Sequence, residues 1–260
     1  MPEHTTDDGC RLAYEVVGRA DAPLLVLSNS LGTDRKLWDP QAAAFAGRFR
    51  LLRYDTRGHG ASDAPPGDYT IDRLGRDVLS LMDHIGARRA HVAGISIGGL
   101  TALWLGAHAS ERVGRLVLAN TAAKIGTPDM WAERLRQIDT DGLASLADGT
   151  MARWFTDGFR EAHPDTVART RATFVATAVE GYLGCCAALR DTDLRGAATR
   201  VVAPALVITG THDVATTPAD GAWLAGAIPG ATLVELDAAH LSNLGCAAAF
   251  TGAVMRFLTD

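Results

Sequence analysis

Ser96 lies between two glycines in the segment 94-GISIG-98, directly after the apolar run 90-AHVAG-94 and at the start of a helix-like run, 97-IGGLTALWLGAHA-109. A serine in such a strand–turn–helix connection is typical of a nucleophile elbow, because glycines allow the strained turn that pushes the hydroxyl into a cleft. The hydroxyl becomes a useful nucleophile when a neighbouring base removes its proton. The segment therefore predicts acyl transfer at Ser96. The alternative is a serine that only caps the N-terminus of a helix.

His240 has the position that the base requires. It follows the last strand-like run, 232-TLVELD-237, at a short turn near the carboxyl end of the chain. The other seven histidines lie near the amino terminus, within predicted strands or helices, or in other loops, where a surface or structural role is expected. We predict that His240 is the general base.

An acid must hold the histidine in the correct tautomer. It can follow either of two strand-like runs, 115-RLVLAN-120 or 205-ALVITG-210. The first run ends in Asn120-Thr121, which is not acidic, whereas Asp213 follows the second. Asp237 is too close to the histidine in sequence to be positioned separately, and we expect it to serve turn structure. The predicted catalytic residues, in the order nucleophile, acid, base, are Ser96, Asp213 and His240.

Two backbone N–H groups are expected to bind the oxyanion that forms during acyl transfer. One is the N–H of Ile97, the residue after the nucleophile. The other is expected in the loop 28-SNSLGTDRKLW-38, where the N–H of Leu31 is the best candidate. No side-chain substitution would remove either donor.

These residues need a sheet to bring them together. Six short apolar runs, bounded by Gly, Asn or Asp, alternate with helix-like stretches such as 72-DRLGRDVLSLMDHIG-86. Continuous apolar strands are typical of a parallel sheet covered on both faces, so we predict an α/β fold with a mostly parallel, doubly wound sheet. The six predicted strands are residues 24–29, 48–55, 90–94, 115–120, 205–210 and 232–237.

The alternation stops between Thr121 and Arg190, where the sequence predicts helices only. Pro128 and Pro164 suit first helical turns, and Asp141 suits an N-cap. We expect this insertion to form a cap over the carboxyl ends of the strands, where ligands bind in open α/β sheets. The predicted helices cover residues 128–138, 141–155, 164–177 and 179–190. The predicted division is a core in two parts, residues 1–121 and 191–260, and a cap, residues 122–190.

Composition limits the range of partners. The formal net charge is −5 and no long basic run is present, which argues against nucleic acid or an anionic membrane. The amino terminus shows no secretory signal and no apolar run is long enough to cross a bilayer, so we expect a cytoplasmic protein. The cysteines lack CxxC spacing, which argues against a zinc site or a disulfide framework; they are Cys10, Cys185, Cys186 and Cys246. The predicted chemistry needs no metal or cofactor, and the oligomeric state is left open.

The chain resembles the α/β-hydrolase fold serine hydrolases over nearly its whole length. It is most similar to the bacterial 3-oxoadipate enol-lactonases of aromatic catabolism, in a stand-alone form without the fused decarboxylase domain of some relatives. The similar segments are 27-LSNSLGTDRKLWDPQ-41, 54-YDTRGHGAS-62, 94-GISIGGL-100, 118-LANTAAKIGT-127, 181-GYLGCCAALRDTDLR-195 and 237-DAAHLSN-243. The second and third are shared with cofactor-free haloperoxidases and many esterases, whereas the first and the cap segments are more discriminating.

This resemblance implies hydrolysis of a small enol-lactone with a carboxylate arm, through an acyl-enzyme, to give 3-oxoadipate. The carboxylate of the substrate needs a cation in an otherwise apolar pocket. Candidates in the cap are Lys124, Arg134 and Arg136, while Arg57 is expected to brace the structure. We favour Arg134, with Trp131 and Trp154 as pocket walls. The alternative is a solvated arginine on an amphipathic helix beside tryptophans that pack the cap.

Three other functions stay open on the sequence. The same residues could serve a general carboxylesterase or a cofactor-free perhydrolase of the haloperoxidase type. A ligand receptor that keeps the hydrolase fold is an alternative from a different class. Epoxide hydrolases and dehalogenases are disfavoured, because they have Asp where this chain has Ser96.

Overall fold

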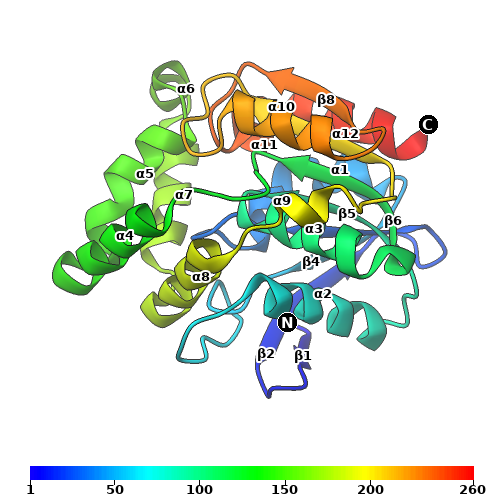
Figure 1. Cartoon of the computed structure of the whole chain (residues 1–260), viewed down its shortest axis with the longest axis horizontal. Coiled ribbons are helices and arrows are strands. Elements are labelled where there is room, and N and C mark those ends of the chain that lie inside the picture. The colour runs from blue at the N-terminus through cyan, green and yellow to red at the C-terminus, as the bar shows by residue number, and fades with distance from the viewer.

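The computed structural model describes residues 1–260 and has an eight-stranded sheet with helices on both faces (Figure 1). The strand order is β1-β2-β4-β3-β5-β6-β7-β8. The pairs β1–β2 and β2–β4 are antiparallel, and all other neighbours are parallel. The strands are β1 Glu3–Thr5, β2 Arg11–Val17, β3 Leu24–Ser28, β4 Arg50–Tyr54, β5 Ala90–Ile95, β6 Val113–Ala119, β7 Ala205–Gly210 and β8 Thr232–Leu236.

All six predicted strands are present, with ends that differ from the prediction by at most two residues. Every residue of β3 and of β7 is buried, as expected for strands covered on both faces. The first two strands were not predicted. β2 is only partly buried along most of its length and therefore carries no continuous apolar run. The antiparallel edge that β1 and β2 form is thus an addition to the predicted parallel sheet.

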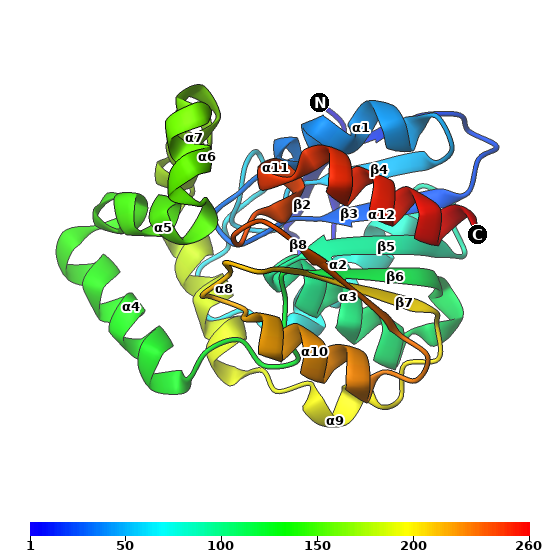
Figure 2. The same cartoon turned by 90° about the horizontal axis from the view of Figure 1, so that it is seen from above.

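The helices of the core lie in two layers (Figure 2). One layer contains α1 and α12 on one face of the sheet, and the other contains α2, α3 and α10 on the opposite face. The core helices and short turns are η1 Arg35–Trp38, α1 Asp39–Ala46, α2 Ile71–His84, α3 Ile97–His108, η2 Ser110–Arg112, α9 Arg195–Ala198, α10 Pro218–Ala227, α11 Ser242–Gly245 and α12 Ala247–Thr259.

Helix α2 illustrates how the sequence forms these helices. Thr70 caps its N-terminus, because its side chain accepts the N–H of Arg73. Its apolar side chains recur every three or four residues and are buried against the core. Gly86, just beyond the helix, has a φ of +73°, a conformation that glycine adopts without the usual penalty and that ends the helix.

The segment between β6 and α9 contains helices joined by loops, with no strand, and lies to one side of the sheet (Figures 1 and 2). Its helices are α4 Pro128–Asp141, η3 Leu143–Leu146, α5 Ala147–Trp154, α6 Asp157–Ala162, α7 Pro164–Val175 and α8 Val179–Asp191. We call this segment the cap. The exact division of the chain at residues 121 and 190 stays a prediction. No single helix is long and apolar enough to cross a membrane; α7 and α8 reach that length only together, with a bend of 92° between them.

Two details of the cap differ from the prediction. Asp141 does not cap a helix: α4 continues to that residue and ends at Gly142, whose φ of +77° turns the chain. The predicted helix 141–155 is therefore divided into η3 and α5. Helix α6 was not predicted, and it begins where the side chain of Thr156 accepts the N–H of Phe159.

Candidate active site

Ser96 lies at the sharp turn between β5 and α3, with φ 58° and ψ −120°. Such a conformation is strained for a residue with a Cβ and persists only when its surroundings enforce it. The two neighbouring glycines allow this, because a Cβ on Gly94 would lie 2.1 Å from the carbonyl oxygen of Gly98, and one on Gly98 would lie 2.4 Å from that of Ser28. The side chain of Ser96 makes no capping hydrogen bond to α3. The hydroxyl is therefore not used as a helix cap.

Asp213 and His240 follow the adjacent parallel strands β7 and β8, and both are buried. The Oδ2 atom of Asp213 lies 2.8 Å from Nδ1 of His240. The carboxylate also accepts the N–H groups of Ala215 and Thr216, the hydroxyl of Thr216 and the side-chain amide of Asn120. Burial raises the pKa of Asp213, but the charge of His240 and these hydrogen bonds outweigh it and lower the pKa from 3.8 to about 2. The ionised carboxylate thus accepts Nδ1–H and leaves Nε2 of the ring as the proton acceptor.

Ser96 and His240 line one cavity of about 240 Å³ between the strand ends and the cap. The cap contributes Trp131, Arg134 and Trp154, three of the four substrate-binding residues predicted from the sequence. The lining residues are Ser30, Leu31, Ser96, Ile125, Met130, Trp131, Arg134, Arg153, Trp154, Tyr182, Leu189, Val214, Ala215 and His240. The predicted nucleophile, base and pocket walls are therefore brought together by elements far apart in the sequence.

The remaining predicted cations lie elsewhere. Lys124 is not part of the cavity lining, and its Nζ lies 3.8 Å from Oδ2 of Asp193. Arg136 is exposed and pairs with Glu133, one turn away on α4. Each of these two side chains has a carboxylate partner within the protein.

Arg57 braces the structure, as expected. Its guanidinium is almost fully buried and donates to both carboxylate oxygens of Asp77 on α2 and to Asp8 near β1. Asp237 makes an exposed side-chain contact with His212, whose Nε2 lies 2.8 Å from Oδ1 of the carboxylate. Neither group reaches the cavity.

Arg153 lines the cavity and was missed by the sequence reasoning. It lies on α5, and its Nη2 donates to the hydroxyl of Thr150 at 3.2 Å. Arg134 on α4 donates to the same hydroxyl at 3.4 Å and to the phenol oxygen of Tyr182 at 2.6 and 2.8 Å. Neither arginine forms an ion pair with a carboxylate, unlike most arginines of the chain.

The two guanidiniums therefore share a partly buried space without a counter-ion. Burial, and secondly the charge of Arg134, lower the pKa of Arg153. Two like charges in such a place disfavour each other, and an anion between or beside them would relieve the repulsion. The cavity thus combines an acyl-transfer arrangement with an unmatched positive charge.

The two predicted oxyanion donors lie in positions that leave their N–H groups available. Leu31 lies in the loop after β3 and lines the cavity; its N–H forms no hydrogen bond within the chain. Ile97 is the first residue of α3, so its N–H has no intrahelical acceptor. The next N–H along the first loop, that of Gly32, donates to Nε2 of the buried His59 at 2.9 Å. This bond fixes the loop beside the cavity.

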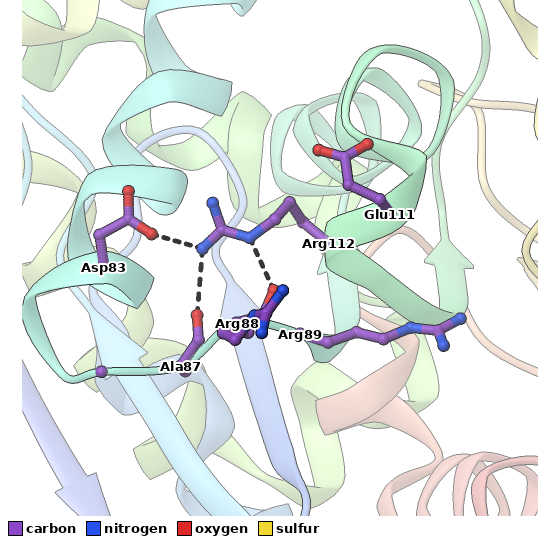
Figure 3. Close-up of a pocket in the computed structure, with 7 residues that line it drawn as sticks. Asp83, Ala87, Arg88, Arg89, Glu111 and Arg112 are labelled. Carbon is purple, nitrogen blue, oxygen red and sulfur yellow. Dashed lines mark hydrogen bonds and ion pairs between the residues drawn. The ribbon is translucent and has the colours of Figure 1, made fainter.

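A larger surface hollow, of about 590 Å³, lies at the amino ends of β5 and β6 (Figure 3). It shares no lining residue with the cavity that Ser96 lines. Its central side chain, Arg112, bonds to the Asp83 carboxylate and to the carbonyl oxygens of Ala87 and Arg88. This guanidinium braces the turn that follows α2. The structure contains no cluster of three or more His, Cys, Asp or Glu side chains that could bind a metal ion. The candidate active site is the smaller cavity at Ser96.

Comparisons with known proteins show the family of this chain. Residues 23–245 match the family model described as alpha/beta hydrolase fold. The chain is 44% identical to 3-oxoadipate enol-lactonase 2 of Acinetobacter baylyi over 243 residues, which cover 94% of this chain and 91% of the relative. It is 40% identical to 3-oxoadipate enol-lactonase 1 of the same organism over 240 residues, which cover 92% and 90% of the two chains.

The fold also matches a solved structure closely. The crystal structure of the enol-lactonase from Burkholderia xenovorans is 49% identical in sequence, has a TM-score of 0.98 and is matched over 100% of both chains. The fold and the resemblance predicted from the sequence are thereby confirmed. This chain belongs to the alpha/beta hydrolase fold family and, within it, to the group of the 3-oxoadipate enol-lactonases.

Proposed function

We propose that this protein opens 3-oxoadipate enol-lactone to 3-oxoadipate by serine catalysis, as a carboxylic ester hydrolase of the beta-ketoadipate pathway. The observation that carries the proposal is the shared cavity, which joins Ser96 and His240 to the unpaired Arg134 and Arg153. The first two residues supply the chemistry of ester hydrolysis. The two arginines select a substrate with a negative charge, which a general esterase has no need to do. The sequence relatives named as 3-oxoadipate enol-lactonases, at 40–44% identity, support the same substrate.

The size and lining of the cavity suit this substrate. Pockets for drug-sized ligands measure roughly 300–1,000 Å³, whereas this cavity measures about 240 Å³. Trp131 and Trp154 supply apolar walls for the lactone ring. The guanidinium of Arg134 lies 6.0 Å from the centre of the Trp131 ring, so this wall and the charge are adjacent. A small ring with one carboxylate arm fits an apolar pocket with cations on one side.

Acylation begins when Nε2 of His240 takes the proton of Ser96 Oγ and this oxygen attacks the ring carbonyl carbon. The carbonyl electron pair moves to oxygen, and the N–H groups of Leu31 and Ile97 stabilise the resulting oxyanion. Each such donor is typically worth about 3 kcal/mol of barrier. Asp213 stabilises the imidazolium that forms, since it remains ionised beside Nδ1.

Collapse of the tetrahedral intermediate re-forms the carbonyl and breaks the bond to the ring oxygen. That oxygen leaves as an enol, protonated by His240, and is a better leaving group than an alkoxide. It stays attached to the acyl group, because both belonged to one ring. Water then attacks the acyl-enzyme by the same steps, with His240 as base, and frees Ser96 and the product. The enol becomes the ketone.

Substrate preference tests the proposal. The kcat/KM for 3-oxoadipate enol-lactone, generated in situ and followed by its ultraviolet loss, is compared with that for a neutral p-nitrophenyl ester. Bromination with peroxide is measured alongside. We expect strong preference for the anionic lactone, with fast multiple turnover. Slow lactone turnover beside brisk ester cleavage or bromination would refute the proposed substrate, and binding without turnover would point to a ligand receptor.

A further inference from the structure

The two oxyanion donors share a structural feature that the catalytic cycle above does not use. A peptide group is a rigid plane, so the N–H of Leu31 and the carbonyl of Ser30 move as one unit and point in opposite directions. The same holds for the N–H of Ile97 and the carbonyl of Ser96. Whatever binds these two carbonyl oxygens therefore determines where the oxyanion donors point.

Each of the two carbonyl oxygens accepts two hydrogen bonds, one of them from a threonine hydroxyl. The oxygen of Ser30 accepts the Oγ1 hydroxyl of Thr33 at 2.7 Å and the N–H of the same residue at 3.2 Å. The oxygen of Ser96 accepts the Oγ1 hydroxyl of Thr121 at 2.8 Å and the N–H of Leu100 at 2.9 Å. Both threonines are buried, with 3% and 1% of their surface exposed.

We propose that Thr33 and Thr121 are positioning residues of the oxyanion hole, each of which orients and polarises one of its two donor peptides. The proposal rests on the proposed function, because it assigns a role within the same acyl transfer. Hydrogen bonds in a chain strengthen one another, so a hydroxyl on the carbonyl makes the N–H of that peptide a better donor. The threonines act through the peptides and touch no reacting atom.

The two threonines come from different places in the fold, which makes the arrangement more than a local turn. Thr33 follows β3 in the loop of its own donor, whereas Thr121 follows β6 and reaches across to the turn after β5. Thr121 also packs closely on α3, since a Cβ on Gly99 would lie 2.7 Å from its Cβ. The neighbouring strand thus holds the peptide that joins Ser96 to Ile97.

The size of the effect follows from two general magnitudes. One oxyanion donor contributes a factor of about 10²–10³ to kcat, and hydrogen-bond cooperativity amounts to roughly 10–30% per bond. Loss of one threonine hydroxyl is therefore expected to lower kcat by roughly two- to eightfold. The two peptides are separate, so the costs are expected to multiply in the double variant.

The test uses Thr33→Val and Thr121→Val, which remove a hydroxyl with little change in volume, and the rescue variants Thr33→Ser and Thr121→Ser. The matched control is Thr101→Val. Thr101 is equally buried and its hydroxyl also donates to a carbonyl oxygen, that of Ile97 at 2.9 Å, but this carbonyl belongs to the peptide after the donor. Loss of the Thr101 hydroxyl should therefore leave both donor peptides in place.

The probe is 5,5,5-trifluoro-4-oxopentanoate, a trifluoromethyl ketone with a carboxylate arm. Oγ of Ser96 adds to its ketone carbon, the serine proton passes to His240, and the carbonyl electron pair becomes an oxyanion that requires the hole. We expect each valine variant to weaken inhibition and to lower kcat for the lactone by roughly two- to eightfold, with KM within about twofold of wild type. The serine variants and Thr101→Val should match wild type.

The proposal is overturned if the threonine-to-valine variants at positions 33 and 121 bind the ketone as tightly as Thr101→Val does, or if KM rises while kcat is unchanged. If Thr121→Val does not fold, Thr33→Val decides the matter by itself. Wild-type protein that binds the ketone no more tightly than Ser96→Ala would instead refute the proposed function. The two failures are therefore distinguishable.

Discussion

Arg153 offers a sharp test of how the cavity recognises its substrate. The change Arg153→Leu removes the charge and keeps an apolar side chain. In the wild-type protein the guanidinium of Arg153 has no carboxylate partner and lies beside Arg134. The substitution therefore removes no ion pair from the free enzyme. The expected loss lies in the complex with an anionic substrate. A hydrogen bond to a charged group is worth about 1.5–3 kcal/mol, which corresponds to roughly 10- to 150-fold in affinity.

The assay compares two substrates with the same lactone ring, one anionic and one neutral: 3-oxoadipate enol-lactone and its methyl ester. We expect Arg153→Leu to lower kcat/KM for the anionic lactone by roughly 10- to 150-fold, mainly through KM, because the arm binds equally in the ground and transition states. For the methyl ester the loss should stay below about twofold. The melting temperature should not fall, since the change relieves the repulsion between two like charges.

The matched control is Arg136→Leu. It removes the same charge from the exposed face of α4, where the guanidinium pairs with Glu133. This variant should leave kcat/KM for both substrates unchanged. An equal loss for the anionic and the neutral substrate in Arg153→Leu, or no loss for either, would refute the assignment of this arginine to the carboxylate.

Further predictions concern the acid, the buried ion pair and the contact between cap and core. Asp213→Asn should lower kcat about 10⁴-fold in the lactone assay, because an amide favours the wrong tautomer of the catalytic histidine. The pKa of Asp213 is lowered from 3.8 to about 2, so the stability that its ionised form contributes is complete above pH 3.8 and is lost as the pH falls toward 2. The melting temperature should therefore fall less with pH over this range in Asp213→Asn than in wild type. Parallel plots of melting temperature against pH for the two proteins would contradict this. Arg57→Met should lower the free energy of unfolding in urea by about 3–5 kcal/mol, because the buried carboxylate of Asp77 loses its main partner; a loss below about 1 kcal/mol would be contrary evidence. Gly181→Ala places a Cβ 2.1 Å from Cα of Gly58. It should lower the free energy of unfolding by about 1–3 kcal/mol and raise KM, because the cap must shift relative to the core. An unchanged KM would show that this contact does not determine the position of the cap.

The residues that follow strand ends could be predicted from the sequence. Short apolar runs mark where parallel strands end, and these ends meet at one edge of the sheet, so the order of the runs suffices to group Ser96, Asp213 and His240. The partly exposed strand β2 could not be found in this way, because no apolar run marks it.

The roles of the cap side chains were harder to predict, because tertiary packing determines which of them face the cavity. Arg153 lies on α5, and the sequence does not show that this face of α5 lines the cavity, which explains why this residue was missed. Lys124 was a candidate from its position alone, but its partner Asp193 follows the last cap helix, α8, far from Lys124 in the sequence. Whether an arginine lacks a carboxylate partner can be judged only from the three-dimensional positions of all the carboxylates.

The central claim is that Ser96 attacks the lactone. The most direct measurement is the ultraviolet loss of 3-oxoadipate enol-lactone with purified wild-type protein and with Ser96→Ala, after a check that both are folded. Loss of the nucleophile of a catalytic triad can approach a factor of about a million in kcat, and we expect a loss of this order. Turnover by Ser96→Ala within about tenfold of wild type would contradict the account, because the reaction would then not depend on the Ser96 hydroxyl.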